Sequence, residues 1–185
     1  MSDQVNFEIN GQNVTARPEE TIWQVANRLG IEIPHLCYLP EKSYRADGNC
    51  RACMVEIDGE RTLAASCIRQ PTEGMIVNSA SERAKKSREM VFELLRVDQP
   101  LRENSHDSKS KFWDWVDKID LNPSERYPTK AQPEADKSHT AIAVHLDACI
   151  QCNLCVRACR EVQSNDVIGM ANRGHQAKIV FDFDT

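Results

Sequence analysis

The sequence predicts an α+β protein in which two small units are joined by a polar connector. Three observations lead to this prediction. An alternating run at residues 5–9 precedes an Asn-Gly pair and indicates a hairpin strand, and a capping pattern at residues 21–24 starts a helix. The composition turns polar between residues 98 and 139, as in a linker. A chain of 185 residues is long enough for one or two such domains.

The first unit is expected to span residues 1–97 and to begin with a β-hairpin. Val5–Ile9 alternates apolar and polar residues, and Asn10-Gly11 favours a tight turn into a strand near residues 13–16. Thr21 then caps a helix that ends near Gly30. The apolar face of this helix consists of Ile22, Val25, Ala26 and Leu29.

Two more strands and a longer helix complete the first unit. The strands are predicted at residues 54–57, before an Asp-Gly turn, and at residues 75–78. Residues 79–82 cap a helix that runs to about residue 96, with one apolar stripe expected to pack on the sheet. The stripe consists of Ala84, Val91, Leu94 and Leu95.

The remaining chain divides into a connector, residues 98–139, and a second unit, residues 140–185. Aromatic and apolar residues at helical spacing predict one short amphipathic helix within the connector. The second unit is expected to contain strands at residues 141–144 and 178–181. The helix residues are Phe112, Trp115, Val116 and Ile119, with Trp113 on another side.

The charge and hydropathy of the chain exclude several classes of function. The net charge of −5 argues against a nucleic-acid partner, which a basic surface would attract. No run approaches 18 apolar residues, so no membrane span is expected. The polar N-terminus does not resemble a secretory signal, which predicts a cytoplasmic protein. A reducing compartment favours metal binding over disulfides for eight cysteines.

The first four cysteines have the spacing C-x12-C-x2-C-x13-C. Each iron of a [2Fe–2S] cluster needs two thiolates, so four cysteines must converge on one small volume. Small residues around the last of them would let the backbone approach closely. A structural zinc site is the alternative, although such sites more often contain two Cys-x-x-Cys pairs. The predicted ligands are Cys37, Cys50, Cys53 and Cys67.

The other four cysteines follow the bacterial ferredoxin spacing, C-x2-C-x2-C-x3-C. Cys149, Cys152 and Cys155 are expected to bind one [4Fe–4S] cluster. Cys159 would either reach a second cluster, as in two-cluster ferredoxins, or be the fourth ligand of the first. Arg160 stands where such ferredoxins usually have a proline. Two cubes need eight ligands, so the domain is expected to be truncated.

The segments around the first quartet resemble one known domain. Residues 33–38, 48–55 and 65–67 are similar to the N-terminal [2Fe–2S] domain of three related groups of proteins. These are the large iron–sulfur subunit of NADH–quinone oxidoreductase, the diaphorase part of NAD-reducing hydrogenases, and NAD-dependent formate dehydrogenases. The resemblance implies a β-grasp fold for about the first 97 residues, with the four cysteines binding the cluster.

The second quartet and its flanks, residues 145–174, resemble the α subunit of molybdenum- or tungsten-dependent, NAD-linked formate dehydrogenases. The resemblance implies a catalytic molybdopterin domain or subunit, and flavin/NAD diaphorase subunits, as partners. Those relatives often carry a further cluster bound by one histidine and three cysteines. Residues 98–139 contain no cysteine for it.

The sequence therefore predicts an electron-relay module without a catalytic site of its own. No nucleotide-binding glycine motif is present, and every cysteine is assigned as a ligand. Molybdopterin, flavin and NAD are expected only on partners. The alternatives are an autonomous ferredoxin-like carrier, the equivalent module of an NADH dehydrogenase or hydrogenase, and a zinc-stabilised interaction module.

Overall fold

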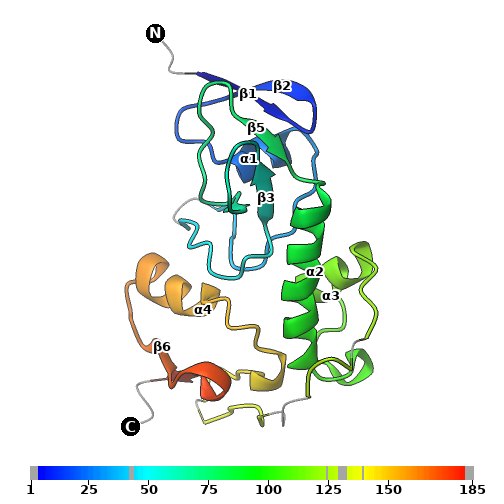
Figure 1. The fold of residues 1–185 in the computed structure, drawn as a ribbon. Coiled ribbons are helices and arrows are strands. Elements are labelled where there is room, and N and C mark those ends of the chain that lie inside the picture. The colour runs from blue at the N-terminus through cyan, green and yellow to red at the C-terminus, as the bar shows by residue number, and fades with distance from the viewer. Residues whose placement is uncertain (1–3, 42–43, 124, 129–132, 139, 182–185) are drawn as a thin grey trace. The chain divides into compact units, whose positions relative to one another are not determined.

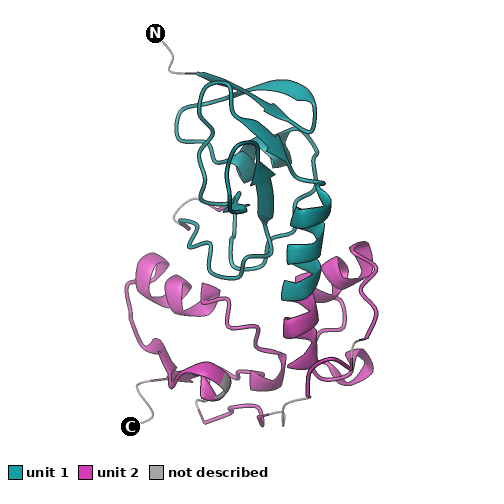
Figure 2. Cartoon of the chain, in the orientation of Figure 1, with its two compact units in different colours: residues 1–40, 45–91 teal, residues 41–44, 92–185 magenta. Residues whose placement is uncertain are grey.

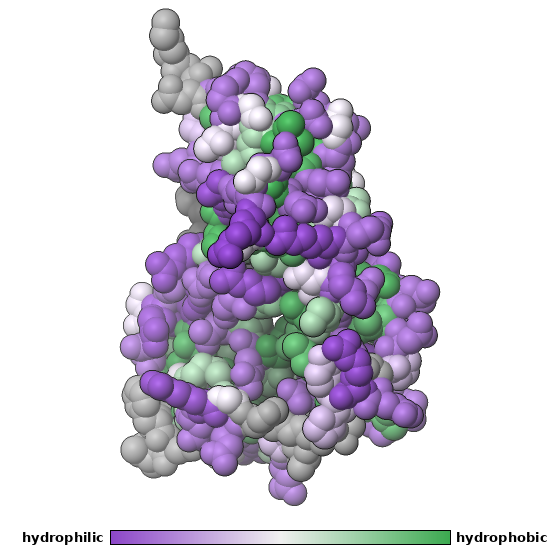
Figure 3. Space-filling model, viewed as in Figure 1, coloured by the Kyte–Doolittle hydropathy of each residue, from purple (hydrophilic) through white to green (hydrophobic). Residues whose placement is uncertain are grey.

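The computed structural model describes residues 4–41, 44–123, 125–128, 133–138 and 140–181, and these residues form two compact units. The first contains residues 1–40 and 45–91, and the second contains residues 41–44 and 92–185 (Figure 2). On the face drawn in Figure 3, most of the surface of each unit is hydrophilic, with smaller hydrophobic patches. No helix among the described residues is both long and apolar enough to span a membrane.

The first unit is built on a five-stranded mixed sheet with the strand order β2-β1-β5-β3-β4. Strands β1 (Val5–Ile9) and β2 (Gln12–Ala16) form the predicted antiparallel hairpin, whose turn has positive φ angles at Asn10 and Gly11. Strand β1 pairs in parallel with β5 (Ile76–Asn78), and β5 pairs antiparallel with β3 (Met54–Ile57). The short β4 (Ala64–Ala65) pairs with β3 at the other edge of the sheet. Figure 1 labels the other four strands of this sheet. The predicted α+β class is confirmed.

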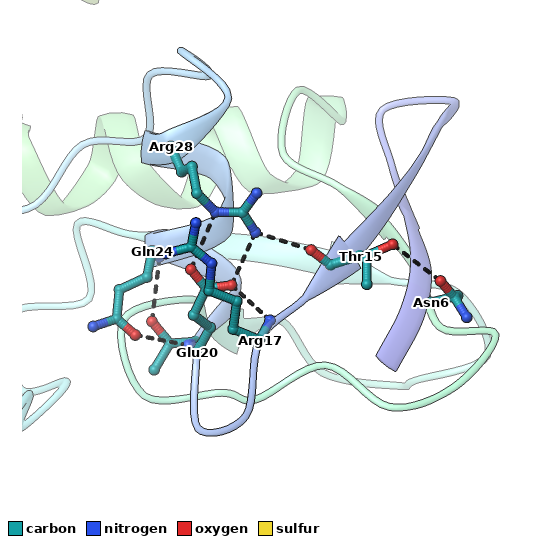
Figure 4. Close-up of polar contacts among 7 residues, drawn as sticks. Asn6, Thr15, Arg17, Glu20, Gln24 and Arg28 are labelled. Atoms are coloured by element: carbon teal, nitrogen blue, oxygen red, sulfur yellow. Dashed lines mark hydrogen bonds and ion pairs between the residues drawn. The ribbon is translucent and has the colours of Figure 1, made fainter. Parts of the chain in front are cut away.

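Helix α1 (Ile22–Arg28) begins at the predicted capping box. The Gln24 N–H donates to the Thr21 hydroxyl at 3.3 Å, and the Thr21 N–H donates to the Gln24 side chain at 2.8 Å. Ahead of the cap, Glu20 accepts hydrogen bonds from the Arg17 N–H and from the Arg28 guanidinium (Figure 4). Leu29, predicted on the buried face, is 42% exposed. The buried residues are Ile22, Trp23, Val25 and Ala26.

Helix α2 (Glu82–Val97) has the predicted length, but of its predicted stripe only Ala84 is buried. Leu94, expected on the sheet, is 49% exposed. The buried positions are Ala84, Arg88 and Phe92, which lie four residues apart on one side of the helix. The boundary between the two units falls within this helix, since its residues up to 91 belong to the first.

The second unit contains the predicted amphipathic helix, α3 (Lys111–Lys118). Phe112 is buried and stacks on Phe92 with ring centroids 5.9 Å apart. Trp113, predicted to face another side, is also buried, because the guanidinium groups of Arg96 and Arg102 lie over its ring. The 3-10 turn η1 (Arg102–Asn104) precedes this helix.

The C-terminal part of the second unit differs from the prediction at one strand. Residues 141–144 are not a strand, because only one isolated bridge, between Asp136 and Val144, forms there. The partner of β7 (Lys178–Phe181) is β6 (Ile168–Ala171), and the two pair antiparallel. Before them come the turn η2 (Leu146–Ala148), helix α4 (Leu154–Arg157) and a π-helical segment, η3 (Ala158–Val162). The turn η4 (Gly174–Gln176) joins β6 to β7.

Candidate iron–sulfur centres

The four cysteines of the first quartet come from three segments of the first unit. Cys37 follows α1, Cys50 and Cys53 precede β3, and Cys67 follows β4. Cys37 is fully buried, Cys53 and Cys67 are 1% exposed, and Cys50 is half-buried. Thiols at this depth are chemically distinct from surface thiols, because water does not solvate their ionised form.

The thiols of this quartet form two pairs. A hydrogen bond with Cys50, together with burial, raises the pKa of Cys37, while the same bond lowers the pKa of Cys50 to about 5. In the second pair, the Cys67 thiol lowers the pKa of Cys53, and the pKa of Cys67 itself rises. Charge on Cys50 also acts on Cys53 and Cys67, so the two pairs lie close to each other.

Backbone groups around the first pair favour thiolate over thiol. The N–H groups of Ala52, Cys37 and Leu36 lower the pKa of the Cys50 thiol, after the larger effect of the Cys37 side chain. The backbone at Arg51 has a φ of 60°, which turns the chain sharply between Cys50 and Cys53. Hydrogen bonds of this kind to ligand sulfurs also influence the potential of a bound cluster.

The loop that carries Cys67 is held by the start of α1. The N–H groups of Ile22 and Trp23, which have no partner within their own helix, donate to the carbonyls of Arg69 and Ser66 at 2.8 and 2.9 Å. The Ser66 hydroxyl in turn donates to the Cys53 carbonyl at 2.7 Å. The buried Ser66 thereby links the segments of the second thiol pair.

The second quartet surrounds a loop with two left-handed residues. Gln151 and Asn153 have φ angles of 53° and 67°, which fold the loop tightly between Cys149 and Cys155. The Gln151 N–H donates to the Cys149 sulfur at 3.4 Å. Although Cys155 is exposed by its accessible surface, partial desolvation by the surrounding chain raises its pKa, and negative charge on Cys152 and Cys149 raises it further. These three thiols therefore lie close enough to interact electrostatically.

Cys159 has a different environment. It is 6% exposed, within η3, and its sulfur accepts a hydrogen bond from the Val167 N–H at 3.3 Å. Its carbonyl accepts from the Asn165 N–H at 3.0 Å. The structure thus places Cys149, Cys152 and Cys155 within electrostatic range of one another and surrounds Cys159 with the segment that leads into β6.

Within the described residues, no three His, Cys, Asp or Glu side chains are close enough to share a single metal ion. In the first quartet, the four thiols are arranged as two pairs, Cys37 with Cys50 and Cys53 with Cys67. Two thiol pairs suit a [2Fe–2S] cluster, because each of its irons takes two thiolates. The donor set and its geometry therefore fit this cluster.

Three polar residues in the units that hold the quartets were not singled out from the sequence. Arg88 is 8% exposed on the inner face of α2. Arg157 is 4% exposed, pairs with Glu161 at 3.3 Å and lies over the ring of Tyr44. The Tyr44 hydroxyl donates to the Leu154 carbonyl at 3.4 Å. The sequence could have revealed Arg88, because this charged residue lies midway between the apolar residues Ala84 and Phe92 at helical spacing.

Comparison with known proteins agrees with this geometry. Residues 2–82 match the family described as the 2Fe-2S iron-sulfur cluster binding domain. All four cysteines of the first quartet lie within the matched residues. The class of the first unit is therefore an iron–sulfur domain of the 2Fe–2S type.

Two curated relatives extend the similarity to most of the chain. A subunit of the NADH-quinone oxidoreductase of Rickettsia prowazekii (strain Madrid E) is 28% identical over 173 residues, which cover 92% of this chain and 25% of the relative. A subunit of the NADP-reducing hydrogenase of Solidesulfovibrio fructosivorans, HndD, is 31% identical over 188 residues. These residues cover 95% of this chain and 31% of the relative. The chain therefore spans about a quarter to a third of the length of these relatives.

A solved structure supports the same relationship. One chain in the crystal structure of an NAD+-reducing [NiFe]-hydrogenase in the H2-reduced state superposes with a TM-score of 0.85 and 26% identity. The match covers 96% of this chain and 74% of that one. The chain is thus homologous to subunits of NADH-quinone oxidoreductases and hydrogenases. The predicted resemblance is confirmed at this level, and formate dehydrogenase is a narrower prediction than these relatives support.

Proposed function

We propose that this chain is an iron–sulfur module that relays electrons within a larger NAD-linked oxidoreductase. Its first unit binds a [2Fe–2S] cluster through Cys37, Cys50, Cys53 and Cys67. The observation that carries this proposal is the convergence of these four cysteines, as two thiol pairs, within the matched iron–sulfur domain. Such a cluster supplies one-electron chemistry.

The protein's own residues prepare this site for an anionic cluster. Buried thiols exclude water, and the N–H groups near Cys50 stabilise negative charge on sulfur. The contacts of Ser66, Ile22 and Trp23 keep the Cys67 loop in position. The protein itself makes these contacts, so they support the loop that carries Cys67.

We further propose that Cys149, Cys152 and Cys155 bind a [4Fe–4S] cluster. Cys159 then binds a second cube or completes the first. Its separate environment beside Val167 favours the second cube. In that case a cysteine from another segment or chain completes the first cube, as expected for the half of a two-cluster ferredoxin domain.

The similar proteins and the sequence around the second quartet favour two kinds of partner for this chain. The hydrogenase structure and the NADH-quinone oxidoreductase relative favour NAD-linked partners with a flavin/NAD site. The segment around the second quartet favours a molybdopterin partner that oxidises formate. The chain would then pass single electrons from the molybdopterin site to the flavin site.

Metal analysis and paired cysteine variants test the cluster assignment. The anaerobically reconstituted protein should contain acid-labile sulfide and, when reduced, show the rhombic electron paramagnetic resonance signal of a [2Fe–2S] centre. Cys53→Ser should abolish or strongly perturb that signal, whereas the matched variant Cys155→Ser should leave it unchanged. Zinc without sulfide would refute the proposal in favour of a structural zinc module.

The choice of partner is tested in the purified complex that contains this chain. The first centre should become reduced when NADH is added anaerobically. Reduction by formate as well would identify the molybdopterin partner, and reduction by hydrogen would identify a hydrogenase instead. If the isolated chain alone oxidised formate, the relay role would be wrong.

A further inference from the structure

The segment before Cys50 contains a glycine that packs against an isoleucine side chain. Gly48 is buried and has a φ of 61°, in the left-handed region that favours glycine. A Cβ at this position would lie 2.9 Å from Cδ1, 3.3 Å from Cγ1 and 3.4 Å from Cγ2 of Ile68. Both branches of the isoleucine side chain therefore lie directly against Gly48.

This contact joins two of the segments that carry the first quartet. Gly48 is two residues before Cys50, and Ile68 directly follows Cys67. Cys50 and Cys67 belong to different thiol pairs. The contact between Gly48 and Ile68 is therefore a packing contact through which one pair can be held relative to the other.

The two sides of this contact differ in how they are supported. The N–H groups of Ile68 and Arg69 both donate to the Ala65 carbonyl, at 3.1 and 3.0 Å. The carbonyls of Ser66 and Arg69 accept hydrogen bonds from the first turn of α1. Residues 44–49, in contrast, belong to no helix or strand. Ile68 is thus held by the backbone around it, and the glycine segment packs on it.

The segment around Cys50 is also where solvent reaches the quartet. Cys50 is half-buried, whereas the other three thiols are at most 1% exposed. Water or a chelator would meet a bound cluster first at its most exposed ligand. Loss of the cluster should therefore begin with outward movement of the segment that carries Cys50.

We propose that Ile68 is a positioning residue for the first iron–sulfur centre: its contact with Gly48 holds the Cys50 segment in place and slows loss of the cluster. This inference rests on the proposed function, since it requires a cluster at the quartet. Glycine at position 48 permits the close approach, because any Cβ would push the isoleucine away. Turning the terminal methyl alone would not relieve the clash, since Cγ1 and Cγ2 are also close and χ1 of a β-branched residue is stiff.

The rate of cluster loss from the whole chain, followed by its visible absorbance in excess chelator, tests this role. Gly48→Ala should lose the cluster about tenfold faster than its control, because it adds a clash in a packed contact. The control is Gly59→Ala, where φ is 75° but a Cβ would meet nothing within 4 Å. Ile68→Ala should also accelerate the loss, whereas Ile76→Ala, at 43% exposure against 46%, should not.

A double variant isolates the contact from other effects of these substitutions. When Ile68→Ala has removed the atoms that face position 48, Gly48→Ala should accelerate cluster loss no more than Gly59→Ala does. Hydrogen exchange of β1 should stay near wild type in every variant. A merely structural role would lower the protection of β1 together with cluster retention.

Each outcome has a defined meaning. A wild-type protein that forms no [2Fe–2S] centre refutes the proposed function itself. Equal rates in Gly48→Ala and Gly59→Ala, or in Ile68→Ala and Ile76→Ala, overturn the role of Ile68 alone, and so does full additivity in the double variant. If Gly48→Ala takes up no cluster, uptake by the double variant supports the proposal, and failure of both overturns it.

Discussion

The two cysteine quartets lie in surroundings of very different depth. The first is part of the core of its unit, where Cys53 and Cys67 pack with Ile9, Val55 and other fully buried side chains. The second lies in a loop beside a two-stranded sheet, and its Cys155 is exposed. A five-stranded sheet with a covering helix can be stable alone, whereas an isolated two-stranded sheet is marginal. The first site is therefore supported by its fold, and the second is expected to depend on the cluster that we propose for it.

Removal of the metal should produce the largest difference between the two regions. Because ligand binding contributes folding free energy where the protein core is small, chelation should unfold the segment around β6 and β7. The amide hydrogens of Gly169–Ala171 should then exchange much faster, while those of Phe7–Ile9 should keep most of their protection. Hydrogen exchange with and without chelator measures both. Equal protection of β6 before and after chelation would contradict the comparison.

Truncation of the core of the first unit should have the next largest effect. Ile9→Ala removes a fully buried side chain and should lower the free energy of unfolding of this unit by about 2–5 kcal/mol. The control Ile76→Ala, on the neighbouring strand, removes a side chain that is 43% exposed and should change it by less than about 0.5 kcal/mol. Urea unfolding of both variants, with hydrogen exchange of β1 as the probe, measures the two free energies of unfolding.

Loss of the α1 cap should have a smaller effect that also reaches the first quartet. Thr21→Ala removes the side-chain cap and should cost about 1 kcal/mol. The first turn of α1 also holds the Cys67 loop through Ile22 and Trp23, so this variant should release its cluster faster than wild type. Thr62→Ala, at an exposed position, is the control. If both variants lost the cluster at the same rate, the α1 cap would not influence the cysteine site.

The smallest effect concerns pH and Glu20. Burial raises the pKa of this carboxyl, but hydrogen bonds from Arg28 and Arg17 outweigh burial and hold the pKa below its usual range. Since the folded-state pKa is depressed, the stabilisation is present above the unfolded pKa of about 4.3 and is lost as the pH falls through the folded value. Glu20→Gln should therefore destabilise the first unit by about 0.2–1 kcal/mol at pH 7 and by less in acid. Thermal melts at pH 7 and pH 3 measure this, and an equal loss at both would count against it.

Local signals in the sequence predicted the first unit well. The Asn10-Gly11 turn, the Thr21 cap and the alternation of β1 each depend on residues within a few positions of one another. The cysteine spacings likewise predicted two iron–sulfur sites before any comparison, and the matched domain supports the first of them. Ligation of either quartet stays a prediction.

The errors all concern contacts between distant residues. Residues 141–144 resemble a strand, but β7 pairs with β6 instead, because pairing depends on which edge is available rather than on propensity. Of the stripe predicted for α2, Ala84 is buried but Leu94 is exposed, and Phe92 and Arg88 are buried instead.

By itself the sequence indicated most elements of the first unit and the two cysteine quartets, and it predicted iron–sulfur clusters as their ligands, since these depend on residue type and spacing. Only the tertiary structure decided which thiols pair and that Cys159 has its own environment. Those features join residues far apart in the chain. Their proximity is set by packing of the whole core, which no local pattern records.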